Sequence, residues 1–186
     1  MPKRSCEPQA WIWTLVRSSW FNQNFSEYFL RDPVLDGEVV LPVGDVRGPF
    51  IDAEDIADVA VAALTEEGHA GQLYELTGPR LLTFADAVAE IAAATGREIR
   101  YGQISPEQCA SALTEQCVPP DFVWLVNYVF TTVLDGRNAY LADGVQRALG
   151  REPRDFSDYA RDAAASGVWD VSALVGARSM ASFSCR

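Results

Sequence analysis

The chain has 186 residues, of which 48% are apolar and 22% are charged. These values are typical of one soluble globular domain and exclude a disordered chain, a fibre and a disulfide-stapled miniprotein. Fifteen Lys and Arg residues against 26 Asp and Glu residues give a formal net charge of −11, and such an acidic chain repels phosphate backbones, so no nucleic acid is expected as a partner through a basic surface.

The lengths of the apolar runs and the positions of the cysteines indicate in which cellular compartment the chain is found. The longest apolar stretch, 122–134, has thirteen residues, fewer than the ~20 that cross a membrane, and the first ten residues do not resemble a signal peptide. Cys109 and Cys117 lie on one expected helix, about 12 Å apart and too far for a disulfide. We therefore expect no membrane partner and a reducing, cytoplasmic location.

The first half of the chain predicts a strand, an aromatic loop and a well-marked helix. The run WIWTLVR (11–17) is typical of a buried strand in a parallel sheet. An amide-rich loop with aromatic residues on one side follows, and these aromatics form either core or a site. After a short apolar run at 39–43, Asp52 is expected to cap a helix with Asp55 as its capping-box partner, and an apolar stripe runs from Ile56 to Leu64.

The second half predicts two more strands, at 72–77 and 98–104, among helices. One helix starts at Thr83 with Asp86 at its third position and stops at Gly96. Four further helices are expected. One starts at Ser105, the next covers 121–135 as a buried apolar element, a shorter one ends at Gly150, and the last starts at Asp155. Strands that alternate with helices indicate an α/β fold.

Several chemistries lack the residues they need. The chain has one His, His69, in a glycine-flanked turn where we expect it at the surface, so a Ser–His–Asp triad and a His-based metal site are not expected. No glycine-rich dinucleotide loop, P-loop or Cys-x-x-Cys motif is present, and Lys3 is the only lysine. The residues by themselves indicate an α/β domain with an aromatic loop after its first strand.

That loop carries a resemblance. Within WTLVRSSWFNQNFSEYF (13–29), a strand ending in Thr-x-x-Arg precedes a pair of small residues and Phe-x-x-Asn. This pattern resembles NmrA-like proteins, which are atypical short-chain dehydrogenase/reductases, except that Ser18 replaces their usual Pro. GPFIDAEDIADVAVAAL (48–64) and the segments at 74–101 and 148–164 resemble the same family in the same order.

The resemblance implies the C-terminal portion of a Rossmann-like parallel sheet. Residues 11–169 would be the NmrA-like portion, with the last part of the sheet at 11–77 and a mostly helical substrate-side lobe with one further strand at 78–169. Residues 1–10 would be an atypical N-terminal segment and 170–186 a disordered tail. The glycine-rich dinucleotide loop of the family lies N-terminal to this portion, so we interpret the chain as a truncated form.

The resemblance also implies a function: NAD(P) binding and hydride transfer to a small substrate, such as a quinone or another aromatic compound. Four residues would contact the nicotinamide end of the cofactor: Ser18, Trp20, Phe21 and Asn24. Phe25 and Tyr28 would lie on the substrate side, and no metal is implied. A non-catalytic NAD(P)-sensing regulator and an inactive fragment are the alternatives.

A portion that lacks the first strands would leave an open sheet edge. We expect the strand at 11–17 to expose Trp11, Ile12, Trp13, Leu15 and Val16. The chain would then form a homodimer through this edge or be an aggregation-prone monomer.

Overall fold

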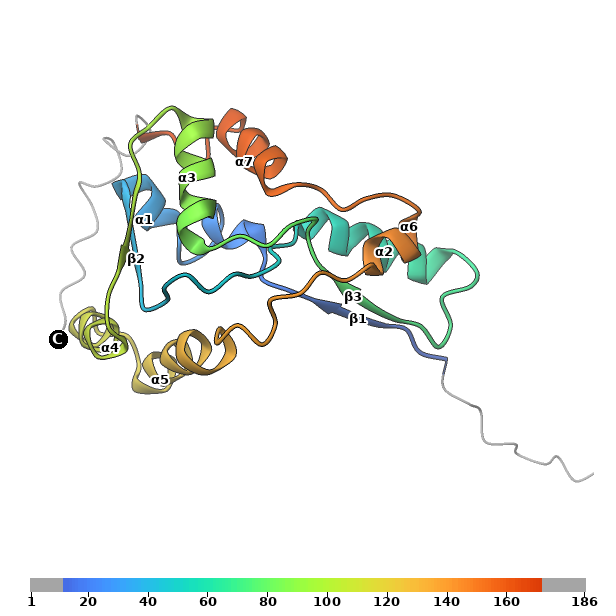
Figure 1. Ribbon diagram of the computed structural model, residues 1–186, viewed down its shortest axis with the longest axis horizontal. Helices are drawn as coiled ribbons and strands as arrows, with labels where there is room; N and C mark the ends of the chain where they lie inside the picture. The colour runs from blue at the N-terminus through green and yellow to red at the C-terminus, as the bar shows by residue number, and fades with distance from the viewer. Residues whose placement is uncertain (1–11, 172–186) are drawn as a thin grey trace, which may run out of the picture.

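Two short parallel sheets organise the chain in the computed structural model, which describes residues 12–171 (Figure 1). Strand β1 (Leu15–Ser18) pairs with β3 (Leu73–Leu76), and β2 (Glu38–Leu41) pairs with β4 (Arg100–Gln103). The two sheets lie toward opposite ends of the long axis. The chain is thus a mixed α/β fold, as predicted, while the segment predicted at 1–10 and all but two residues of the one at 170–186 lie outside the described residues.

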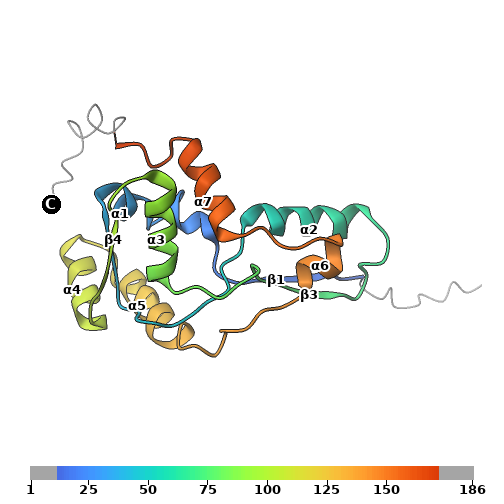
Figure 2. The same ribbon diagram turned by 45° about the horizontal axis from the view of Figure 1, so that its top comes forward.

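The β1–β3 sheet has one covered face and one open face. Helices α2 (Ala53–Thr65) and α6 (Gly144–Leu149) lie on the same side of it (Figure 2). Val16 and the buried Tyr74 and Leu76 pack there in a small core with Val59 and Val145. On the opposite face the register pairs Leu15 with Leu73, which are 48% and 38% exposed.

A larger core lies between the helices. It joins the short 3-10 helix η1 (Asn22–Phe25), α1 (Arg31–Asp36), α3 (Phe84–Thr95) and α7 (Phe156–Ala165). The fully buried Phe25 ring lies 5.7–6.1 Å, centroid to centroid, from Phe50, Phe84 and Phe156. The indole N–H of Trp169 donates to the Phe25 carbonyl at 2.9 Å, which closes this core with the end of the described chain.

Local cap signals are confirmed at several helices. Thr83 and Asp86 form a reciprocal capping box at α3, and Gly96 ends that helix at φ +66°, a left-handed conformation that favours glycine. Ser105 and Gln108 form a second capping box at α4 (Pro106–Glu115). Asp155 accepts the Ser157 amide at the start of α7.

The apolar segment 121–135 differs from the expected buried helix. It forms α5 (Pro120–Tyr128) and a π-helical turn, η2 (Val129–Val133), in which Phe130 is the one buried side chain. Trp124 and Tyr128 stack on each other at 5.4 Å and remain 66% and 44% exposed. The prediction of a buried element was wrong because α4 and α5 form a peripheral pair that packs mainly on itself (Figure 1).

Two side chains are placed differently from the prediction, and the local sequence pattern marks neither placement. His69 is buried, not at the surface, and its Nδ1 lies 2.8 Å from the Tyr74 hydroxyl. Leu64, expected in the apolar stripe of α2, is 86% exposed, and Val59 and Ala62 are buried instead. Among residues 12–171, no helix has both the length and the apolar character to cross a membrane.

Candidate functional site

A cavity of about 300 Å³ opens at the carboxyl ends of β1 and β3. Its lining includes Ser18, the last residue of β1, with Ser19 after it, and Leu76, the last residue of β3, with Thr77 after it. Ligands of open α/β folds bind at this end of parallel strands, because neighbouring chain segments diverge there and leave a crevice. The cavity therefore lies where the topology favours a ligand site.

Thr77 fixes the loop that covers one side of this cavity. Its hydroxyl donates to the Ala142 carbonyl at 3.2 Å and accepts the Ala142 amide at 3.0 Å. Asn138 and Tyr140 precede this anchor and line the cavity. A single side chain thereby holds the 136–142 segment against the end of β3.

The walls are largely apolar. Trp20 forms one wall, and its ring lies 5.3 Å from Phe84 and 5.8 Å from Phe130, centroid to centroid. Val133 and Leu134 add aliphatic surface from the end of η2. The Trp20 Nε1 atom is buried and has no hydrogen-bond partner within the described part of the chain. The walls can thus surround a flat apolar ring.

Two arginines line the cavity with different environments. Arg17 Nη1 lies 2.8 Å from Glu75 Oε1, and both residues belong to the lining. Arg47 is exposed and forms no ion pair or hydrogen bond through its guanidinium to any residue between 12 and 171. Arg17 is therefore neutralised locally, whereas the charge of Arg47 is available to a ligand.

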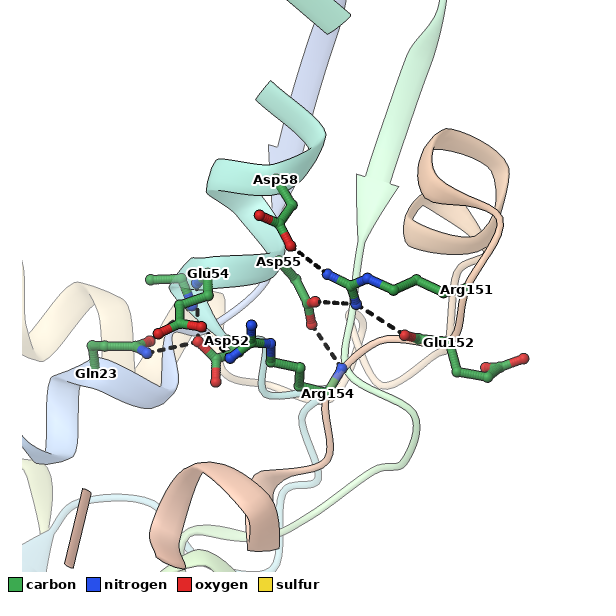
Figure 3. Close-up of polar contacts among 9 residues, drawn as sticks. Gln23, Asp52, Glu54, Asp55, Asp58, Arg151, Glu152 and Arg154 are labelled. Carbon is green, nitrogen blue, oxygen red and sulfur yellow. Dashed lines mark hydrogen bonds and ion pairs between the residues drawn. The ribbon is translucent and has the colours of Figure 1, made fainter. Parts of the chain in front are cut away.

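A polar network anchors the segment between β1 and α2 (Figure 3). The Gln23 amide donates to Asp52 Oδ1 at 2.8 Å and accepts the Ala53 amide at 2.9 Å. Asp52 in turn caps α2 by accepting the Glu54 amide, as predicted. Gln23 thus ties η1, which follows the cavity wall at Trp20, to the first turn of α2.

Asp55 extends this network to the C-terminal part of the chain. Its fully buried carboxylate accepts Arg151 Nη1 at 2.6 Å and the Arg154 backbone amide at 2.8 Å. Figure 3 shows both arginines reaching from one segment to the start of α2. The prediction that Asp55 completes a capping box was wrong, because its carboxylate points to these distant partners.

The six residues expected at a site separate into those at the cavity and those away from it. Ser18 and Trp20 line the cavity. Phe21 pairs through its backbone with Ile51 and is 40% exposed, and the Asn24 backbone bonds within the turn. Phe25 lies in the larger core, and Tyr28 is 60% exposed against Phe29. The binding roles of all six stay predictions.

Other lining residues were not identified from the sequence. Arg47 lies in the GDVRGP segment after β2, and a basic side chain in a glycine- and proline-bounded loop was the available signal. Thr77 and Tyr140 have no local signature, because they reach the cavity through the packing of distant segments. In the part of the chain that the structure describes, no group of His, Cys, Asp and Glu residues could hold a metal ion.

Comparison with known proteins places this geometry in context. The chain is 36% identical over 166 residues to an NAD(P)H azoreductase from Xenophilus azovorans, a match that covers 88% of this chain and 57% of the relative. An NADPH-dependent quinone oxidoreductase from Escherichia coli, solved with NADPH, has a TM-score of 0.70 at 20% identity over 82% of this chain and 54% of its own. A mutant of NmrA gives 0.51 at 18% identity over 82% and 53%.

These matches agree on the fold and on partial coverage. The two solved structures show that the described elements follow a Rossmann-like arrangement. The chain spans about half the length of the relatives that it matches. No family model matches the sequence.

Proposed function

We propose that this chain, which belongs to the NmrA-like family of atypical short-chain dehydrogenase/reductases, provides the nicotinamide and substrate side of an NAD(P)H-dependent reductase. The substrate would be a small, flat molecule such as a quinone or another aromatic compound. The observation that carries the proposal is the apolar cavity at the carboxyl ends of β1 and β3, with Ser18 and Trp20 in its lining.

The cavity fits one end of a dinucleotide. Its volume of about 300 Å³ is at the lower end of the range for small-molecule sites and supports binding of a ring. A pyrophosphate would need free backbone N–H groups at a helix start, but α2, α3, α4 and α7 each have a side chain that accepts an N-terminal amide. These helix starts therefore give no support for a pyrophosphate site.

The cofactor would supply the hydride, and the chain would supply position and a dry pocket. The Trp20 ring, held by Phe84 and Phe130, would present a flat wall. Val133 and Leu134, which also line the cavity, would exclude water from the ring. The Ser18 hydroxyl, at the end of β1, would be available to hydrogen-bond a polar edge of the nicotinamide or the substrate.

Thermal unfolding of the 186-residue chain, with and without NADPH and NADH, tests the proposal. A ligand at ~100 times its Kd adds ~2.7 kcal/mol to the free energy of unfolding, which raises Tm by about 5–11 °C in a chain of this size. A Trp20→Ala variant, whose truncation removes the wall, should lose that increase. Leu64→Ala, on the exposed end of α2, serves as the control.

The outcomes separate the proposed reductase from its alternatives. Stabilisation by NADPH together with reduction of a quinone supports the reductase. Stabilisation without turnover favours a non-catalytic NAD(P)-sensing regulator. A cooperatively folded chain that neither cofactor stabilises contradicts the proposal and favours an inactive fragment.

We also propose a location and a partner. The location we propose is the cytoplasm, because four Cys in 186 residues do not resemble a disulfide framework; within the structure Cys109 is free and Cys117 is disulfide-bonded. Within residues 12–171, β1 pairs with β3 alone, and the β3-facing hydrogen bonds use the Leu15 and Ser19 amides. Amides alternate in direction along a strand, so those of Val16 and Ser18 face the open edge, where a second copy of the chain would pair.

A further inference from the structure

The cavity carries one positive charge that its own lining does not neutralise. Arg17 and Glu75 pair at 2.8 Å and leave no net charge between them. Arg47 lines the same cavity, yet its guanidinium forms no hydrogen bond or ion pair within the described 12–171 segment. In a chain with a formal charge of −11, a cationic side chain without such a contact at an apolar cavity marks a place for an anion.

The backbone beside Arg47 is held in place. Gly48 and Leu82 exchange both backbone hydrogen bonds, at 2.8 and 3.0 Å, and the buried Pro49 follows. Anchoring the next residue reduces the conformational entropy that a bound anion would cost at this position. The side chain remains exposed and can reach a ligand from this anchored loop.

The charge of Arg47 acts on the Asp86 carboxylate through space. Two hydrogen bonds from Thr83 lower the pKa of Asp86, and the charge of Arg47 lowers it further. The Asp86 carboxylate accepts the Thr83 amide at 2.9 Å in the α3 capping box. Asp86 is therefore committed to the helix cap and leaves the Arg47 hydrogen-bond donors for another acceptor.

We propose that the cavity takes an apolar, ring-containing substrate that carries an anionic group, and that Arg47 binds that group. The inference rests on the proposed function for the identity of the cavity as a substrate site. Trp20, Val133 and Leu134 contact the ring, and the Arg47 guanidinium pairs with a carboxylate, sulfonate or phosphate at the rim. Arg47 selects between substrates of similar shape and different charge.

Two probes of matched shape test the charge preference: naphthalene-2-sulfonate, which is anionic, and naphthalene-2-sulfonamide, which is neutral at pH 7. Isothermal titration calorimetry on the full chain measures the Kd of each. Charge-assisted hydrogen bonds predict at least about tenfold tighter binding of the sulfonate. The preference should disappear in Arg47→Met, fall partly in Arg47→Lys, and persist in Arg100→Met, which removes an exposed arginine of β4.

NADPH titrated into the same four proteins separates this inference from the proposed function. A sulfonate preference that Arg47→Met leaves intact overturns the inference, and so does a wild-type chain that binds both probes equally or binds neither. Weaker NADPH binding by Arg47→Met, with an unchanged probe ratio, assigns Arg47 to the cofactor and also overturns it. An Arg47-dependent sulfonate preference without NADPH binding supports the anion site while the reductase proposal fails.

Discussion

Asp55 and Arg151 are 96 positions apart in the sequence, and their side chains meet at 2.6 Å. The Asp55 side chain is fully buried, whereas that of Arg151 is 38% exposed and also reaches Asp58 at 2.6 Å. The Arg154 backbone amide donates a hydrogen bond to the second carboxylate oxygen of Asp55. This contact fastens the segment between α6 and α7 to the first turn of α2 and so fixes how the C-terminal part lies on the β1–β3 sheet.

Replacement of Asp55 should therefore cost more stability than replacement of Asp58. Asp55→Asn puts an amide N–H₂ in place of one carboxylate oxygen. The group that donates to that oxygen, either Arg151 Nη1 or the Arg154 amide, is then left without an acceptor. We expect a loss of about 3 kcal/mol in the free energy of unfolding. Asp58→Asn, at a side chain 51% exposed, should lose at most about 1 kcal/mol. Urea unfolding measures both, and equal losses would contradict the role of Asp55.

Gly78 permits a close approach that no other residue type allows. A Cβ atom built there would lie 2.0 Å from the Phe50 carbonyl oxygen, which belongs to the backbone and cannot move aside cheaply. Gly78→Ala should lower the free energy of unfolding by about 2 kcal/mol or more. Gly102→Ala is the matched control, since its Cβ meets Val40 at an ordinary 3.6 Å. Similar urea midpoints for the two variants would argue against this packing.

Local signals in the sequence predict the helix starts well. Thr83 with Asp86, and Ser105 with Gln108, are three residues apart, and their contacts form within one turn of helix. Ser18 and Trp20 were identified through a resemblance to a family and lie at the cavity. Both kinds of signal depend on neighbouring residues, which the sequence shows directly.

Features that depend on distant partners could not be predicted in the same way. Asp55 has the spacing of a capping box, and nothing near it in sequence shows that Arg151 and Arg154 would take its carboxylate. Phe25 and Tyr28 are three residues apart, yet one is fully buried and the other 60% exposed. The short η1 helix and the packing of α7 decide which aromatic enters the core, and neither leaves a local pattern.

The stability of α7 should depend on acid pH through Asp155. Arg80 donates two hydrogen bonds of 2.7 Å to its carboxylate and holds the pKa of Asp155 well below its ordinary value of 3.8. The unfolded chain then takes up this proton first, so the stabilisation is complete above about pH 4 and is lost as the pH falls further.

Asp155→Asn should accordingly be less stable than the wild type at pH 7, with a difference that shrinks between pH 4 and pH 2. Chemical denaturation across that pH range gives the difference directly. Asp32→Asn, at a side chain 84% exposed, should follow the wild type throughout. A difference that stays constant with pH would show that Asp155 acts as a helix cap without a linked proton.

The open edge of β1 predicts self-association. The strand expected at 11–17 begins only at Leu15. Ile12 and Trp13, which precede it, and Leu15 are 85%, 55% and 48% exposed, in agreement with the expected exposure. Val16 is partly buried against the small core, contrary to that expectation, and Trp11 lies outside the described residues. An unpaired strand edge with apolar neighbours favours pairing with another chain.

Sedimentation velocity should show a concentration-dependent dimer. Trp13→Lys combined with Leu15→Lys should shift it to monomer, because the added charges of the two copies would repel beside the paired strands and the contact would lose apolar area. Leu64→Lys, on the exposed end of α2, adds charge away from the edge and should leave the dimer intact. A wild-type chain that stays monomeric at high concentration would rule out the edge as an interface, since the apolar side chains would then be stable in water without a partner.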